Sequence, residues 1–128
     1  MKKIGKLSPR ARLKSLAHAS TGLGDMLVSE PNAWVHALAT IAVLGLAFWL
    51  RVGRVKFCLL ILAIVSVWAA EAFNTVLEIM ADLAVPEPHS KVVRRAKDIS
   101  AGAVLVACLG ALAVGVIVLG PPLLARLS

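Results

Sequence analysis

Residues 57–82 read FCLLILAIVSVWAAEAFNTVLEIMAD, and this stretch decides the fold. Its first fourteen residues, Phe57 to Ala70, carry no charge, whereas its last twelve carry three carboxylates and an amide. At about 100° per residue, these four polar positions fall at roughly 0°, −60°, −20° and +20° around a helix axis. The side chains that share this face are Glu71, Asn74, Glu78 and Asp82. The pattern therefore predicts one long helix with a narrow polar face.

The length of the uncharged run places the polar face relative to a membrane. The alternative is a helix that ends at Ala70, followed by a solvated helix from Glu71 onward. Fourteen residues rise only about 21 Å, which is less than the roughly 30 Å of bilayer hydrocarbon. Glu71 and Asn74 are therefore expected at or near membrane depth. Ionisable groups there are costly and are normally paired, bound to metal or facing a wet cavity, which favours a functional site over a purely structural network.

The composition agrees with a membrane protein. The chain has 128 residues, of which 59% are hydrophobic, and its charges fall in blocks between apolar runs; its mean hydropathy is +0.87. A soluble core does not absorb this much apolar residue content. We predict a single all-α integral membrane domain over residues 1–128, with transmembrane helices at about 34–50, 57–80 and 102–124. Trp34 and Trp49 mark the interfaces of the first span.

The segments outside the spans have distinct compositions. Arg51 to Lys56 is basic and contains Gly53, so it predicts the turn of a helical hairpin. Leu83 to about Ser100 contains Pro86 and Pro88 and is predicted to be a connection. Residues 9–28 are loosely amphipathic, weakened by two glycines, and predict a surface helix along the membrane. The first thirty residues do not resemble a signal peptide, and we expect the N-terminus to be retained.

The distribution of Lys and Arg predicts the orientation. Ten of the fourteen lie in the N-terminal region and the second connection, and four lie at the other ends of the spans. The positive-inside rule then places the N-terminus and the second connection in the cytoplasm. The net charge of +7 is explained by this topology and by anionic lipid headgroups, because the basic residues flank apolar stretches. We therefore expect no nucleic-acid partner.

Acidic and basic groups are expected to meet on the cytoplasmic side. Glu30, just before the first span, adds a carboxylate to those of the second, and clustered carboxylates favour a hard cation such as Mg²⁺. Lys97 and Asp98 precede the third span, with Arg94 and Arg95 one turn earlier. Together the two clusters suit a magnesium-bound polyphosphate. The sequence has no GxxxxGK[ST] or GxGxxG motif, which excludes a soluble-type nucleotide fold, and no HExxH or Ser/His/Asp arrangement. Three histidines are each expected to be interface hydrogen bonders: His18, His36 and His89.

Two motifs resemble the prokaryotic diacylglycerol kinase family, which includes the undecaprenol kinases. The first is EAFNTVLE at residues 71–78 followed by Asp82, and the second is RAKDISAGAVL at residues 95–105. The N-terminal part is similar to the undecaprenol kinase branch through RLKSL at 12–16, Gly22 and the EPNAWVH segment at 30–36. The resemblance covers about residues 12–110. It implies a lipid kinase of the bacterial inner membrane that uses ATP and Mg²⁺ and forms a homotrimer.

The resemblance also implies roles for individual residues. Glu78 would be the general base that takes the proton of the lipid hydroxyl, and Glu30 and Glu78 would hold Mg²⁺. Glu71 would support the metal and phosphate site and, with Asn74, contact the nucleotide or the lipid headgroup. The further ATP-binding residues would be Lys97, Asp98, Arg12 and Lys14.

The lipid and two other functional classes stay open from the sequence. Glu30, Asn32 and His36 favour undecaprenol, with diacylglycerol as the second choice. The loop after Pro86 is about one residue longer than the family spacing, which puts a nucleotide role for His89 in doubt. An ion- or proton-conducting protein with a carboxylate-lined pore would leave the basic residues 94–97 unexplained. A helical hairpin that serves as a scaffold for another membrane protein is a further alternative, and it predicts that Glu78→Gln has almost no effect on function.

Overall fold

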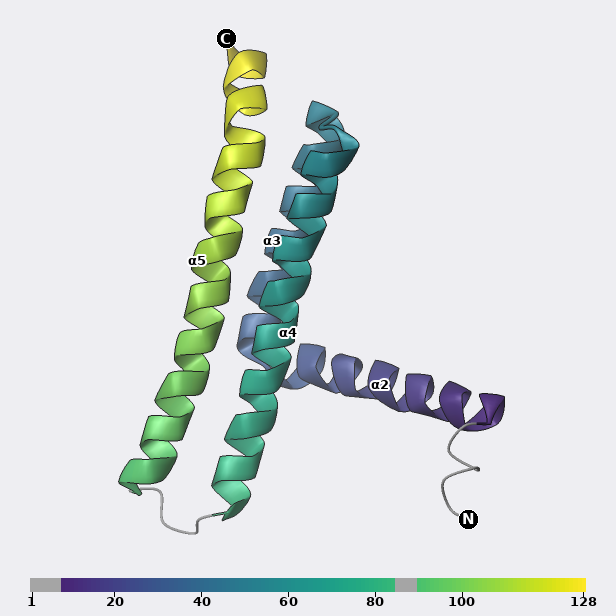
Figure 1. The fold of residues 1–128 in the computed structure, drawn as a ribbon, viewed down its shortest axis with the longest axis vertical. Helices are drawn as coiled ribbons and strands as arrows, with labels where there is room; N and C mark the ends of the chain where they lie inside the picture. Colours follow the sequence, from purple (N-terminus) through teal and green to yellow (C-terminus); the bar gives the residue numbers. More distant parts are fainter. Residues whose placement is uncertain (1–7, 85–89) are drawn as a thin grey trace.

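The computed structural model describes residues 8–84 and 90–128, which form four helices (Figure 1). They are α2 (Pro9–Ser29), α3 (Pro31–Leu50), α4 (Arg54–Ala84) and α5 (Lys91–Leu127). The last three are long and apolar enough to cross a membrane. The predicted all-α fold with three membrane spans is therefore confirmed. Pro86, Pro88 and His89 lie outside the described residues.

The second span is one continuous helix, as the polar face predicted. α4 runs from Arg54 through Ala70 to Ala84, so the alternative of a helix that ends at Ala70 is wrong. Its start at Arg54 shortens the predicted turn, which is confined to residues 51–53. Arg51 ends α3 in the left-handed conformation, with φ 53° and ψ 47°, and its N–H donates to the carbonyls of Ala47 and Phe48.

The helix that contains the third predicted span begins earlier than expected. α5 starts at Lys91, so the basic residues 94–97 are helical and do not belong to a loop up to Ser100. Ser90 caps this helix, because its hydroxyl accepts the N–H of Val93 at 3.4 Å. The charges mark where the apolar span ends, but Lys, Arg and Ala are all good helix formers and do not end the helix.

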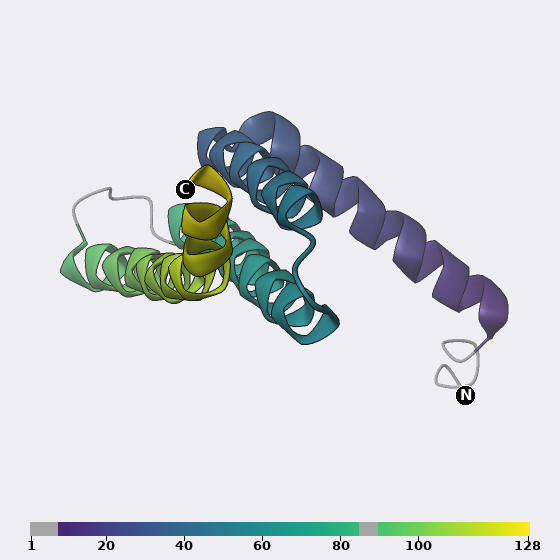
Figure 2. The same ribbon diagram turned by 90° about the horizontal axis from the view of Figure 1, so that it is seen from above.

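α2 and α3 are joined by the single residue Glu30. Its backbone is extended, with φ −104° and ψ 117°, and its N–H donates to the Met26 carbonyl. Pro31 then begins α3, a position where its missing N–H costs nothing. At the other end of α2, Ser8 caps the helix by accepting from the Ala11 N–H. The result is a sharp corner, and α2 projects sideways from the bundle (Figures 1 and 2).

The three long helices bury few side chains. A small apolar core joins them near the end that carries residues 51–53, and it consists of Ala47, Leu60, Val118 and Leu119. Most large apolar side chains point outward instead, as Ile41 at 70% and Ile117 at 73% exposure illustrate. Exposed apolar surface of this extent requires lipid or another protein surface against it. The only buried side chain of α2 is Met26, so the rest of this helix has little contact with the bundle. The predicted position of α2 along a membrane surface stays a prediction.

Candidate functional site

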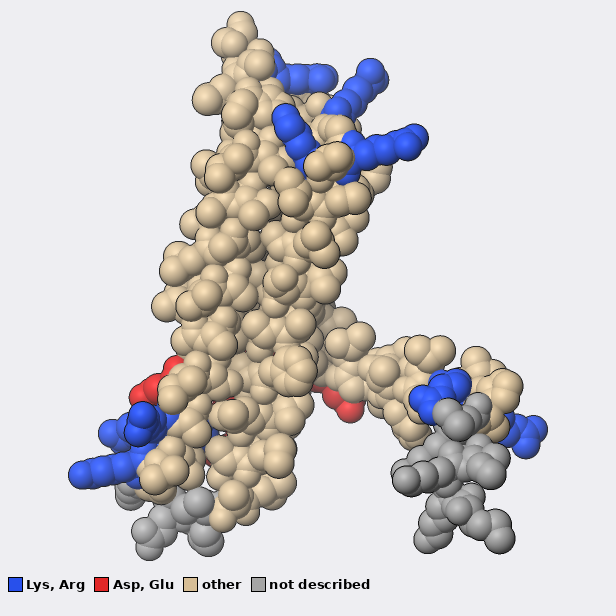
Figure 3. All heavy atoms as spheres, viewed as in Figure 1, with Lys and Arg blue, Asp and Glu red and all other residues tan. Residues whose placement is uncertain are grey.

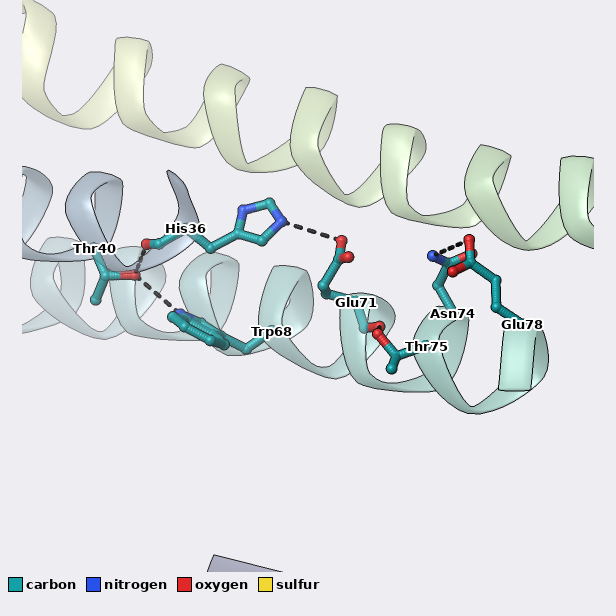
Figure 4. A network of polar contacts seen from close by, with 7 residues as sticks. All are labelled: His36, Thr40, Trp68, Glu71, Asn74, Thr75 and Glu78. Carbon is teal, nitrogen blue, oxygen red and sulfur yellow. Dashed lines mark hydrogen bonds and ion pairs between the residues drawn. The ribbon is translucent and has the colours of Figure 1, made fainter. Parts of the chain in front are cut away.

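The polar face of α4 is buried at its centre. Glu71 is 1% exposed and Asn74 is 7% exposed. Glu78, one turn further on, is partly exposed, and Asp82 is exposed. Figure 4 shows the first three side chains pointing from α4 toward α5. The expectation that Glu71 and Asn74 lie at or near membrane depth stays a prediction, because this burial is within the chain itself.

Glu71 is paired with a histidine of the neighbouring helix. The Nε2 atom of His36, on α3, lies 3.2 Å from Oε2 of Glu71, and the histidine side chain is 14% exposed (Figure 4). The Nε2–H tautomer donates to the carboxylate in this geometry. A buried carboxylate needs such a partner, because an unpaired charge in an apolar interior is costly. The sequence singled out both residues but did not predict that they meet.

A second polar contact between α3 and α4 lies one turn away from this pair. The indole N–H of Trp68 donates to the hydroxyl oxygen of Thr40 at 3.0 Å. The same hydroxyl donates to the His36 carbonyl at 2.7 Å, and the Trp68 ring meets the His36 ring edge to face with centroids 6.1 Å apart. Sequence reasoning missed Thr40 and Trp68, because neither belongs to the polar face of α4 or to a charged motif.

Two buried acceptor oxygens lack a donor. Asn74 donates from Nδ2 to Oε1 of Glu78 at 3.3 Å, which orients its amide. Within the described part of the chain, Oε1 of Glu71 and Oδ1 of Asn74 have no hydrogen-bond partner. Leaving such an atom unsatisfied costs about 1–3 kcal/mol. These oxygens therefore favour a cation or a hydrogen-bond donor supplied from outside the chain.

The exposed end of the polar face is connected to α5. Asp82 forms an ion pair with Lys97, and their side chains are 67% and 36% exposed. An ion pair this exposed contributes little to stability, about 0–1 kcal/mol. It does bring Lys97, predicted to bind ATP, to within one helical turn of Glu78. Asp98, the next residue, is exposed.

The remaining predicted site residues are less closely connected. No hydrogen bond or ion pair is found between Glu30, Lys14 or Asp98 and the polar face of α4 over residues 8–84 and 90–128. Arg12 and Lys14 lie in the first turns of α2, and eighteen residues of helix separate Arg12 from Glu30, about 27 Å. Across the same residues, no cluster of three or more His, Cys, Asp or Glu is placed to share a metal ion. The proposed Mg²⁺ ligands thus stay a prediction.

These features define a class: a protein with three helices that fit membrane spans, in which α4 carries a buried carboxylate and amide. A lysine of α5 pairs with an exposed carboxylate further along the same face. Comparison with known proteins agrees. The family described as prokaryotic diacylglycerol kinase matches residues 17–119. A protein named diacylglycerol kinase from Synechocystis is 34% identical over 112 residues, 88% of this chain and 64% of that protein. One named undecaprenol kinase from Bacillus subtilis is 31% identical over 110 residues, 86% of this chain and 89% of that protein.

The chain therefore belongs to the prokaryotic diacylglycerol kinase family. This confirms the family predicted from the motifs at residues 71–78 and 95–105, and with it the lipid kinase class. The chain spans less than two thirds of the length of the Synechocystis protein and most of the length of the Bacillus protein.

Proposed function

We propose that this chain transfers the γ-phosphate of ATP to the hydroxyl group of a membrane lipid alcohol, either undecaprenol or diacylglycerol. The products are the lipid phosphate and ADP. The observation that carries the proposal is the buried polar face of α4, with two acceptor oxygens left unsatisfied inside an otherwise apolar bundle. The names of the two relatives, a diacylglycerol kinase and an undecaprenol kinase, support it.

Glu78 is the proposed general base. A lipid hydroxyl is a weak acid, so a carboxylate must accept its proton as the oxygen attacks phosphorus. Glu78 is partly exposed, unlike Glu71, so a substrate reaches it without opening the helix pair. The Asn74 amide donates to one of its oxygens, which holds the carboxylate and leaves the other oxygen for the substrate. Glu71, which His36 holds, lies about two helical turns before Glu78 on the same face.

The residues fit a magnesium ion. Mg²⁺ prefers one or two carboxylates together with phosphates and waters, so the absence of a three-ligand cluster in the described residues is no obstacle. The proposed ligands are Glu30 and Glu78, and the unsatisfied oxygens of Glu71 and Asn74 are further hard donors on the polar face of α4. When bound, the ion neutralises charge on the phosphates, which is the main requirement of phosphoryl transfer.

The nucleotide is proposed to meet basic residues of α5 and α2. Lys97 is paired with Asp82, so the triphosphate competes with that carboxylate for the ammonium group. The exchange is inexpensive because the pair is exposed. Asp98 is proposed to position the nucleotide, and Arg12 and Lys14 to approach the phosphates from α2.

The proposed assembly is a homotrimer in the bacterial inner membrane with a cytoplasmic N-terminus. One chain leaves large apolar side chains exposed along all three spans, and neighbouring copies would cover part of them. The Lys and Arg distribution supports the orientation. α2 is proposed to lie along the cytoplasmic surface of the membrane, as its direction away from the bundle suggests (Figure 1).

Phosphate transfer from labelled ATP tests the proposal. Full-length protein in mixed micelles with Mg²⁺ receives undecaprenol and diacylglycerol side by side, and each lipid phosphate is measured. Glu78→Gln is expected to lower transfer by at least about a hundredfold, the usual contribution of a positioned general base. The matched control is Asp25→Asn on α2, which removes one exposed carboxylate and should leave the rate unchanged.

The outcomes separate the functional classes. Transfer to one lipid that collapses in Glu78→Gln establishes the kinase and names its substrate. No transfer to either lipid by folded, oligomeric wild-type protein overturns the proposal for both substrates. Ion flux through vesicles without ATP would then favour the conducting protein considered from the sequence.

A further inference from the structure

A second charged region lies at the opposite end of the bundle from the polar face. Four cations gather there, where the turn after α3 meets the end of α5 (Figure 3, upper part). We call them the distal basic cluster: Arg51, Arg54, Lys56 and Arg126. Residues 31–70 and 99–128 contain no Asp or Glu, so no acidic side chain of these spans balances the cluster.

The charges of the distal basic cluster are largely uncompensated. Neither of the two ion pairs found among residues 8–84 and 90–128 involves it. Arg126 lies over the Trp49 ring, 4.5 Å from its centroid, which fixes it at the interface of α3 and α5. The other three cations, Arg51 in the turn and Arg54 and Lys56 in the first turn of α4, are exposed. The cluster therefore presents a concentrated positive field at one end of the membrane span.

Membrane topology does not account for these cations. Positive residues set orientation by staying on the cytoplasmic side, and ten of the fourteen Lys and Arg residues are at the other end. Four cations opposite them weaken that signal. Attraction to anionic lipid headgroups, the other explanation for the basic residues of this chain, fits these four cations better than orientation does.

A pocket beside the cluster combines charge with apolar surface. It has a volume of about 440 Å³ and is lined by Ala47, Phe48, Arg51, Val52, Arg54, Phe57 and Cys58. Phe48 and Phe57 form its aromatic wall, edge to face with centroids 5.3 Å apart. Arg51 and Arg54 thus line a pocket whose aromatic wall suits hydrocarbon. A ligand that fits has an anionic head and an apolar chain.

The backbone at Arg51 has the left-handed conformation that ends many helices. Its φ of 53° lies in the left-handed region, which costs a residue with a Cβ about 1–2 kcal/mol. Glycine adopts this conformation without the penalty.

We infer that this pocket binds an anionic phospholipid, with its phosphate between Arg51 and Arg54 and an acyl chain along Phe48 and Phe57. Guanidinium groups match phosphate oxygens with two parallel hydrogen bonds. The charge complementarity and the apolar wall together select a lipid over a soluble phosphate, which has nothing to place against the two rings. The inference does not depend on the kinase activity.

Lipid retention tests the inference. Full-length protein is reconstituted in nanodiscs with equal amounts of phosphatidylglycerol and phosphatidylcholine, released, and analysed by native mass spectrometry for bound lipid. The wild type is expected to retain phosphatidylglycerol preferentially. The variant Arg51→Gly with Arg54→Gln is expected to reduce this preference by roughly tenfold to thirtyfold, from about 1 kcal/mol per cation near an anionic surface. Arg51→Gly preserves the turn, because glycine favours its conformation.

Two further variants make the result specific. Arg10→Gln with Lys91→Gln removes the same charge from exposed positions outside the cluster and should leave the preference unchanged. Phe48→Ala should weaken retention of the phospholipid. It should not weaken binding of glycerol phosphate, which is measured by its competition with the bound phospholipid. Equal retention of both lipids by the wild type overturns the inference. An equal loss of the phosphatidylglycerol preference in the charge-matched control also overturns it. The same holds if glycerol phosphate displaces the lipid and Phe48→Ala has no effect on lipid retention.

Discussion

Replacing His36 by leucine removes the donor that faces the buried Glu71 carboxylate. Both oxygens of Glu71 are then unsatisfied, because Oε1 already lacks a partner within the described residues. A hydrogen bond between membrane helices is worth about 0.6 kcal/mol on average and up to about 1.7 kcal/mol. A newly orphaned buried acceptor adds about 1–3 kcal/mol. His36→Leu should therefore lower the free energy of unfolding by about 2–4 kcal/mol.

A double-mutant cycle separates this pair from general packing. Glu71→Gln keeps the shape of the side chain but removes its charge, so His36→Leu should cost at least about 1 kcal/mol less in that background. Reversible unfolding in mixed micelles with increasing denaturing detergent measures the four free energies. Ser66→Ala is the matched control, since this hydroxyl bonds only the Leu62 carbonyl of its own helix. Equal costs of His36→Leu in the two backgrounds would refute the coupling.

Three further changes have defined outcomes. Lys97→Met should raise the KM for ATP severalfold, measured by steady-state kinetics. It should change the free energy of unfolding by less than about 1 kcal/mol, because the ion pair of Lys97 with Asp82 is exposed. A larger loss in an unfolding measurement would contradict this account. Arg51→Gly alone should leave the chain as stable or up to about 1 kcal/mol more stable, checked by thermal unfolding, because glycine relieves the left-handed backbone. Chelation of Mg²⁺ should abolish phosphate transfer, and readdition of Mg²⁺ should restore it. Phosphate transfer that persists after chelation would refute the proposed metal site.

The sequence predicted the features that depend on depth and periodicity. A continuous second span followed from the fourteen uncharged residues, which are too few to cross the hydrocarbon, and α4 runs through Ala70 as expected. The start of α5 was missed by about three helical turns, because charges end an apolar span without ending a helix. Glycine and basic residues marked the hairpin turn, but only residues 51–53 leave the helices.

The contacts within the site were less accessible to sequence reasoning. His36 and Glu71 are 35 residues apart, and their meeting depends on how α3 and α4 are rotated against each other. Periodicity gives the face of one helix but not its rotation relative to another. Thr40 and Trp68 resemble ordinary span residues, so nothing in the sequence indicated their hydrogen bond. The catalytic, metal and nucleotide roles of the site residues stay predictions until activity is measured.

The single-residue corner at Glu30 makes α2 a lever with a fixed pivot. Its 21 residues extend about 31 Å from the joint. A tilt that moves the far end by several ångströms displaces Glu30 itself very little, because the pivot is the residue itself. If α2 lies along the membrane surface as proposed, a movement of its basic far end leaves the carboxylate at the corner almost in place. The length of α2 would then separate such movements from the acidic residues of the site.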